Sequence, residues 1–197
     1  MGTVKAKKNA ITRKTYTVEG DTIEAIYNDL LKKQIGGTDA VGDCTTPVKI
    51  PSIAKFDEEE NKKPKKKGEV EWTVSAKAGY EVEMDAIITL PVLKSDKNLS
   101  AAGKKEWARF LKDLSAHEDL HVEAAWTVAE EIAAELTRMK ATGSGKDKDA
   151  AIKAAVADYV KQFKAEYGGD KVSKRVDKAH KALDAKGNTF EMDLDTE

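Results

Sequence analysis

The feature that most constrains this 197-residue chain is a hydrophobic stripe of helical period that begins after Ser100. Residues at steps of three and four lie on one face of an α-helix. The stripe therefore predicts one long helix with a continuous inward face, which residues 141–146 bring to an end. Its members are Trp107, Leu111, Leu114, Glu118, His121, Ala125, Val128, Ile132 and Leu136.

The chain before this stripe has a different period. Apolar and polar residues alternate over residues 70–74 and 80–90, which predicts two strands with one buried face each. Shorter patterns predict a strand over residues 14–18, a helix over 23–31 and a weak strand over 47–56. Helical spacing returns over residues 152–163 and 172–183. The sequence thus predicts an α+β fold, in which an antiparallel sheet of three to five strands packs on the long central helix plus three further helices.

Length and charge limit the domain organisation and the partners. We expect a flexible N-terminal tail over residues 1–13, a single domain over 14–190 and an acidic tail over 191–197. The 34 basic and 35 acidic residues nearly cancel, so we expect no nucleic-acid partner. No run approaches the roughly 18 apolar residues of a transmembrane helix, and the first residues lack the apolar stretch of a signal peptide. A lone Cys44 excludes an internal disulfide and a cysteine-cluster metal site.

Two residues of the inward stripe, Glu118 and His121, do not belong in an ordinary core. With His117 they form the sequence His-Glu-Asp-Leu-His, the H-E-x-x-H pattern. Residues four apart on a helix share a face, so both imidazoles can converge on one tetrahedral ion. Glu118 can then reach a water molecule beside that ion. The alternative is that both histidines are hydrogen-bonded core or rim residues that bind nothing, but a buried glutamate requires a compensating charge, which favours a cation.

A catalytic zinc ion usually has three protein ligands, and the motif supplies two of them. His180 is the remaining histidine of the chain and borders the apolar face of the last predicted helix, so we predict that it is the third ligand. Carboxylates remain alternatives to it, and the candidates are Asp184, Asp177, Glu130 and Glu131.

Several segments, in the order found here, resemble one known family. They are residues 16–22, the strand around Trp72, residues 87–91, residues 107–114 and the motif at 117–121. Over residues 14–190 the chain resembles the bacterial secreted zinc-dependent proteases classed as domain of unknown function 922 (DUF922). The resemblance implies a zincin-like fold, a zinc ion, peptidase activity and a secreted or periplasmic location. It also implies a substrate strand added at the edge of the strand over 80–90.

The chain departs from the family pattern in two respects. Family members tend to carry cysteines around the second strand, and this chain has none there. They also tend to carry a histidine after the last helix, where this chain has Thr189. The third ligand is therefore left to His180 or to a carboxylate.

The resulting expectation is a peptidase that holds one Zn²⁺ through His117, His121 and His180 and cleaves a peptide or protein substrate. Glu118 would act as the general base. Two alternatives remain open: a zinc-binding module without turnover, and an interaction protein that uses its charged faces. An oxyanion donor is also required, and the candidates are Tyr159, Tyr167 and Arg175.

Overall fold

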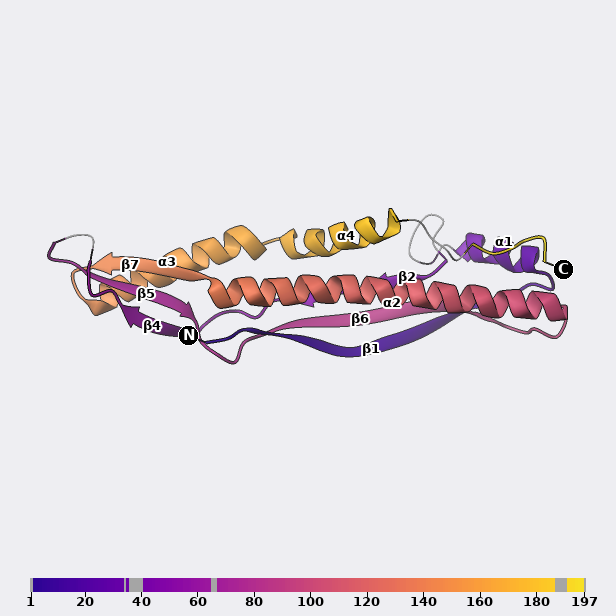
Figure 1. The fold of residues 1–197 in the computed structure, drawn as a ribbon, viewed down its shortest axis with the longest axis horizontal. Coiled ribbons are helices and arrows are strands. Elements are labelled where there is room, and N and C mark those ends of the chain that lie inside the picture. Colours follow the sequence, from indigo (N-terminus) through magenta and orange to yellow (C-terminus); the bar gives the residue numbers. More distant parts are fainter. Residues whose placement is uncertain (1, 34, 36–40, 65–66, 187–190, 197) are drawn as a thin grey trace. The chain divides into compact units, whose positions relative to one another are not determined.

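The mixed α+β character predicted from the sequence is confirmed. The computed structural model describes residues 2–33, 35, 41–64, 67–186 and 191–196 (Figure 1). The helices within these ranges are α1 (Ile23–Lys33), α2 (Ala101–Arg138), α3 (Lys148–Tyr167) and α4 (Lys171–Asp184). The strands are β1 (Lys5–Val18), β2 (Asp43–Thr45), β3 (Val48–Lys49), β4 (Phe56–Glu60), β5 (Val70–Ala76), β6 (Glu81–Leu93) and β7 (Lys140–Gly145). Among the described residues, no helix has the length and apolar character that crossing a bilayer requires.

The strands form two small sheets rather than one. In one sheet, β6 lies between β1 and β2 and also pairs with β3; in the other, β5 lies between β4 and β7. The two alternating strands of the sequence are thus confirmed as β5 and β6, but they belong to different sheets. Because β6 is paired on both sides, the expectation that a substrate strand adds to its edge is wrong.

The chain forms two compact units. The first contains Met1–Lys8, Val48–Met84 and Trp126–Asp177, and the second contains Asn9–Pro47, Asp85–Ala125 and Lys178–Glu197. Long elements contribute to both, since β1, β6, α2 and α4 each have residues in the two units. The single domain over residues 14–190 stays a prediction.

In the first unit, α3 packs on the sheet that contains β5 and β7 (Figure 1). Strand β7 can approach this helix closely because Gly143 lacks a side chain: a Cβ atom there would lie 2.2 Å from the backbone nitrogen of Ala155. Tyr159 of α3 is fully buried and meets the Phe56 ring edge-on at 5.1 Å. The sequence pattern predicts only a helix break at residues 141–146, because the small residues that permit this packing are also typical of loops.

In the second unit, α1 and the first half of α2 share a core. Ile23, Ile26 and Leu30 of α1 are buried with Phe110 and Leu114 of α2. The apolar spacing that predicts the first helix therefore also identifies its buried face. This core fixes the part of α2 that carries the H-E-x-x-H sequence.

Both predicted tails differ from the structure. Strand β1 begins at Lys5, whose N–H donates to the carbonyl oxygen of Tyr80 at 3.0 Å. Near the other end, Met192 is buried in the core of the second unit, and the N–H of Asp193 donates to Oε1 of Glu106 at 2.8 Å. The charged composition of these segments predicts tails. Main-chain hydrogen bonds and one buried apolar residue are nevertheless enough to give them structure, and composition does not report either.

We expect Glu106→Gln to destabilise the second unit by about 1–3 kcal/mol at pH 7, because it removes a charged, buried hydrogen-bond acceptor. Glu106 accepts from Nη2 of Arg109 at 2.6 Å and from Nε at 2.8 Å. The Arg109 guanidinium holds the pKa of Glu106 below its ordinary value. Urea unfolding at neutral and acidic pH measures the difference between wild type and variant.

The pH dependence of this difference has a definite sign. A folded-state pKa that is lowered gives stability above the unfolded-state pKa of about 4.3, and this stability is lost as pH falls through the folded value. The difference in the free energy of unfolding between wild type and Glu106→Gln should therefore become smaller below pH 4. Glu59→Gln, at an exposed position on β4, is the control and should show no such difference. A difference that does not depend on pH would contradict the prediction.

Candidate metal centre

Helix α2 brings the two motif histidines together in the second unit. His117 and His121 are one turn apart, and their Nε2 atoms lie 3.0 Å from each other. The ring planes are nearly perpendicular, at 89°. The side chains are only 13% and 10% exposed. Both Nε2 atoms therefore point at one small, sheltered volume.

A carboxylate from α4 completes a group of three donor atoms. Oδ1 of Asp184 lies 3.3 Å from Nε2 of His117 and 3.2 Å from Nε2 of His121. A tetrahedral ion with bonds of about 2.0–2.1 Å keeps its ligand atoms about 3.3 Å apart. The three spacings thus fit one ion, and His117, His121 and Asp184 form a group that can hold a metal.

His180 lies beside this group but is engaged elsewhere. Its ring centroid is 4.6 Å from that of His121, and its Nε2 is 3.1 Å from Oγ1 of the buried Thr46. The sequence predicts His180 as the third ligand, with Asp184 among the alternatives. The structure brings the Asp184 carboxylate to the histidine pair and gives the His180 imidazole a hydroxyl partner.

The other candidates from the sequence belong to the first unit. Glu130, Glu131 and Asp177 are not members of the donor group, which lies wholly in the second unit. The same applies to the three candidate oxyanion donors. Tyr167 and Arg175 both bond to Glu135, at 2.9 and 2.7 Å, and Tyr159 packs against Phe56.

The electrostatics of the site favour a cation. Glu118 is 5% exposed, and burial raises its pKa to about 7, with further contributions from the charges of Asp43, Asp184 and Asp119. Burial also lowers the pKa of His121, assisted by the neighbouring His180. A neutral imidazole is the form that binds metals, and a positive ion would offset the concentration of negative charge.

The second nitrogen of His121 departs from the usual pattern of histidine ligands. Metal-bound histidines generally donate their other ring N–H to an acceptor. Nδ1 of His121 is buried and has no hydrogen-bond partner among the described residues. Among the described residues, this ring packs edge-on against the rings of His117 and His180.

The chain was compared with models of known protein families. Residues 13–192 match the model of DUF922, described as a bacterial protein of unknown function. The chain belongs to the DUF922 family. The matched range contains α2, α4 and every residue of the donor group. Searches of curated proteins and of solved structures found no match.

Two contributors to this DUF922 site carry no motif of their own in the sequence. Thr46 follows Thr45 in a short segment for which the sequence pattern predicts neither a helix nor a strand. Asp184 is exposed and follows His180 by four residues, a spacing that places both on one face of α4. That spacing could have shown that Asp184 shares a helix face with His180, but it does not rank one residue above the other as a ligand.

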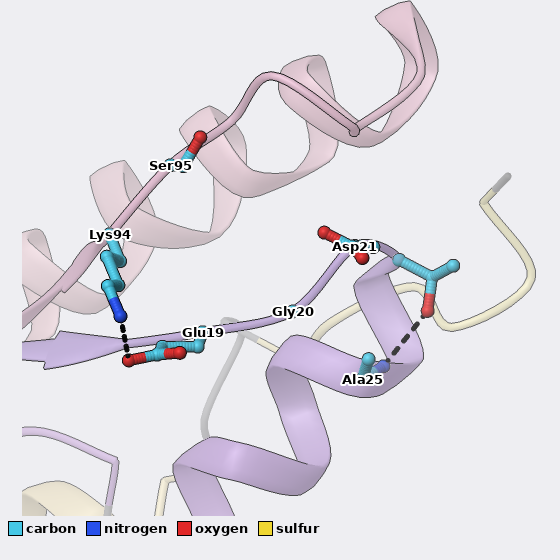
Figure 2. A pocket seen from close by; sticks show the side chains of 7 residues that line it. Glu19, Gly20, Asp21, Ala25, Lys94 and Ser95 are labelled. Atoms are coloured by element: carbon cyan, nitrogen blue, oxygen red, sulfur yellow. Dashed lines mark hydrogen bonds and ion pairs between the residues drawn. The ribbon is translucent and has the colours of Figure 1, made fainter.

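A hollow of this DUF922 member lies at the start of α1 (Figure 2). Its volume is about 460 Å³, and Lys94 and Glu19 form an ion pair at 2.9 Å within it. Thr22 caps the helix there by accepting from the N–H of Ala25 at 3.1 Å. Lys94 and Glu19 are exposed and neutralise each other, so we assign this hollow no chemistry. The lining residues are Glu19, Gly20, Asp21, Thr22, Ala25, Lys94 and Ser95.

Proposed function

We propose that this DUF922 member is a zinc-dependent peptidase of zincin-like type. His117, His121 and Asp184 would hold the zinc ion, and Glu118 would be the general base. The observation that supports this most directly is the spacing of the three donor atoms, 3.0–3.3 Å, in and around an H-E-x-x-H sequence. The donor set fits zinc because two imidazoles and one carboxylate are common ligands of catalytic zinc sites.

The number of ligands favours catalysis over a purely structural role. Structural zinc sites have four protein ligands, whereas catalytic sites have three and leave a position open. Asp184 is 49% exposed, so the donor group has a side that faces solvent. A substrate carbonyl or a water molecule can approach from there.

A bound zinc ion would supply Lewis-acid chemistry, polarising a peptide carbonyl and lowering the pKa of water. The proton transfers would be carried out by a residue of the chain. Glu118 would take a proton from the attacking water and pass it to the leaving amine. The buried setting of Glu118 raises its pKa to about 7, which suits a group that takes up and returns a proton near neutral pH.

The substrate and location follow from the same proposal. Hydrolysis of an amide at such a site implies a peptide or protein substrate. The family resemblance adds a secreted or periplasmic location, where such an enzyme would meet proteins outside the cytoplasm.

We expect freshly purified protein to contain about one zinc ion per chain, since three preformed ligands bind the ion before any substrate arrives. Removing it with a chelator should lower the melting temperature, because a ligand of the folded state stabilises that state. Elemental analysis and thermal unfolding measure both effects. His117→Ala is the matched control and should show neither; protein that contains no transition metal before chelation would contradict the prediction.

A casein-type cleavage assay on the same samples then tests the activity. Cleavage that is lost on chelation and restored by zinc supports the peptidase. One observation favours a second candidate, a metal-binding module without turnover: the His180 ring lies against His121 and could supply a fourth protein ligand. Zinc at full occupancy without cleavage would support this module.

A further inference from the structure

A short segment before β2 lies directly against the Glu118 side chain. An ideal Cβ atom built on Gly42 would lie 2.5 Å from Oε1 of Glu118 and 3.0 Å from Cδ1 of Leu114. Real Cβ atoms essentially never come within 3.0 Å of another heavy atom. Any residue larger than glycine at position 42 would therefore displace the Glu118 carboxylate or the segment itself.

The same segment is also held by strand β1. The hydroxyl of Tyr16 donates to the carbonyl oxygen of Val41 at 2.7 Å. Val41 is 9% exposed and belongs to the core of the second unit, against which Tyr16 also packs. Position 41 is thus fixed by one hydrogen bond and by apolar packing, and Gly42 follows it directly.

We propose that Gly42 and Tyr16 are positioning residues for Glu118. The backbone at Gly42 limits the space available to the Glu118 carboxylate. Tyr16 fixes the position of this backbone through its hydrogen bond to Val41. Neither residue belongs to the donor group for the metal, so their effect should reach the chemistry through the position of Glu118. The inference rests on the proposed function only in its catalytic consequence, because the contact itself exists without a metal.

The first experiment tests the contact in metal-free protein. Urea unfolding in chelator is measured for wild type, Gly42→Ala, Glu118→Ala and the double variant. Gly42→Ala should raise the unfolding equilibrium constant by about 10-fold or more with Glu118 present, and by less than about 3-fold in the Glu118→Ala background. Gly103→Ala, where the added carbon meets nothing closer than 3.4 Å, is the control. Equal costs in the two backgrounds would overturn the proposal.

The second experiment tests positioning with Co²⁺ as a visible substitute for zinc and acetohydroxamate as the probe. This acid chelates the ion and gives a proton or hydrogen bond to an adjacent carboxylate, so its affinity reports where Glu118 lies. Tyr16→Phe should weaken binding by about 5-fold and Gly42→Ala by about 20-fold, since a misplaced hydrogen-bond partner costs about 1–2 kcal/mol. The affinity of both variants for Co²⁺ should stay within a factor of about three of the wild-type affinity.

A rescue variant separates positioning from general loosening. Gly42→Ala combined with Glu118→Asp shortens the carboxylate by one methylene and should bind acetohydroxamate more tightly than Gly42→Ala alone. Tyr27→Phe, which changes a tyrosine packed against the same core, should match wild type. The proposal would be overturned if Tyr16→Phe bound acetohydroxamate as tightly as wild type does. It would also be overturned if the double variant bound it no more tightly than Gly42→Ala. Failure of wild type to bind cobalt would instead defeat the proposed function, and the unfolding experiment would still decide the contact.

Discussion

The Glu118→Gln variant should retain its zinc while losing about 10²-fold or more of any peptidase activity. The amide keeps the size of the side chain but cannot accept a proton, and general base catalysis usually contributes 10²–10⁴-fold. His117, His121 and Asp184 are unchanged in the variant, so the metal affinity should differ little. The loss should appear in kcat, because the removed interaction acts in the transition state.

The measurement requires metal content and cleavage rate on the same preparation. Glu130→Gln is a matched control: it makes the same change at an exposed position of the same helix, outside the donor group. It should match wild type in both readings. Equal rates for Glu118→Gln and wild type, at equal zinc content, would refute the role of Glu118 in the proposed mechanism.

The parts of the fold that local sequence patterns determine could be predicted. Helix α2 follows from apolar residues at steps of three and four, and the same spacing places His117 and His121 on one face. The buried face of α1 was found in the same way. In each case the information lies within a few consecutive turns of one element, which is what periodicity can report.

Features that depend on pairing between distant segments could not be predicted. Strand β7 pairs with β5 over residues 140–145, yet its one alanine and two glycines have weak strand propensity. Its small residues are explained only by the helix that packs on them. Likewise, the assignment of β5 and β6 to different sheets is a matter of partners, and the alternation of each strand says nothing about its partner.

The candidate site shows the same difference between local and long-range information. The motif on α2 is enough to predict the two histidine ligands. The choice between Asp184 and His180 depends instead on how α4 lies within the second unit. Both residues are on one face of that helix, four positions apart. Only the distances to the histidine pair distinguish them, and distances between helices are not encoded in a local pattern.

Asp184→Ala should weaken zinc binding by more than about 100-fold, close to the effect of His121→Ala. Loss of a residue that supports a ligand typically costs 10–100-fold in metal affinity, and loss of a ligand itself should cost at least as much. His180→Ala should cost less than about 10-fold, because its Nε2 is engaged by Thr46 and its ring only packs against His121. Competition with a chelating dye gives each dissociation constant.

The control for this series is Asp177→Ala, which removes a carboxylate from the same helix at a position outside the donor group. It should bind zinc as wild type does, which excludes a general effect of charge on α4. The opposite ranking, with His180→Ala as damaging as His121→Ala and Asp184→Ala nearly silent, would contradict the assignment. The His180 ring would then have to leave Thr46 when the metal binds, and the third ligand would be the one that the sequence selects. A large loss in both variants would indicate four protein ligands, and such a closed site is typical of structural zinc rather than of a peptidase.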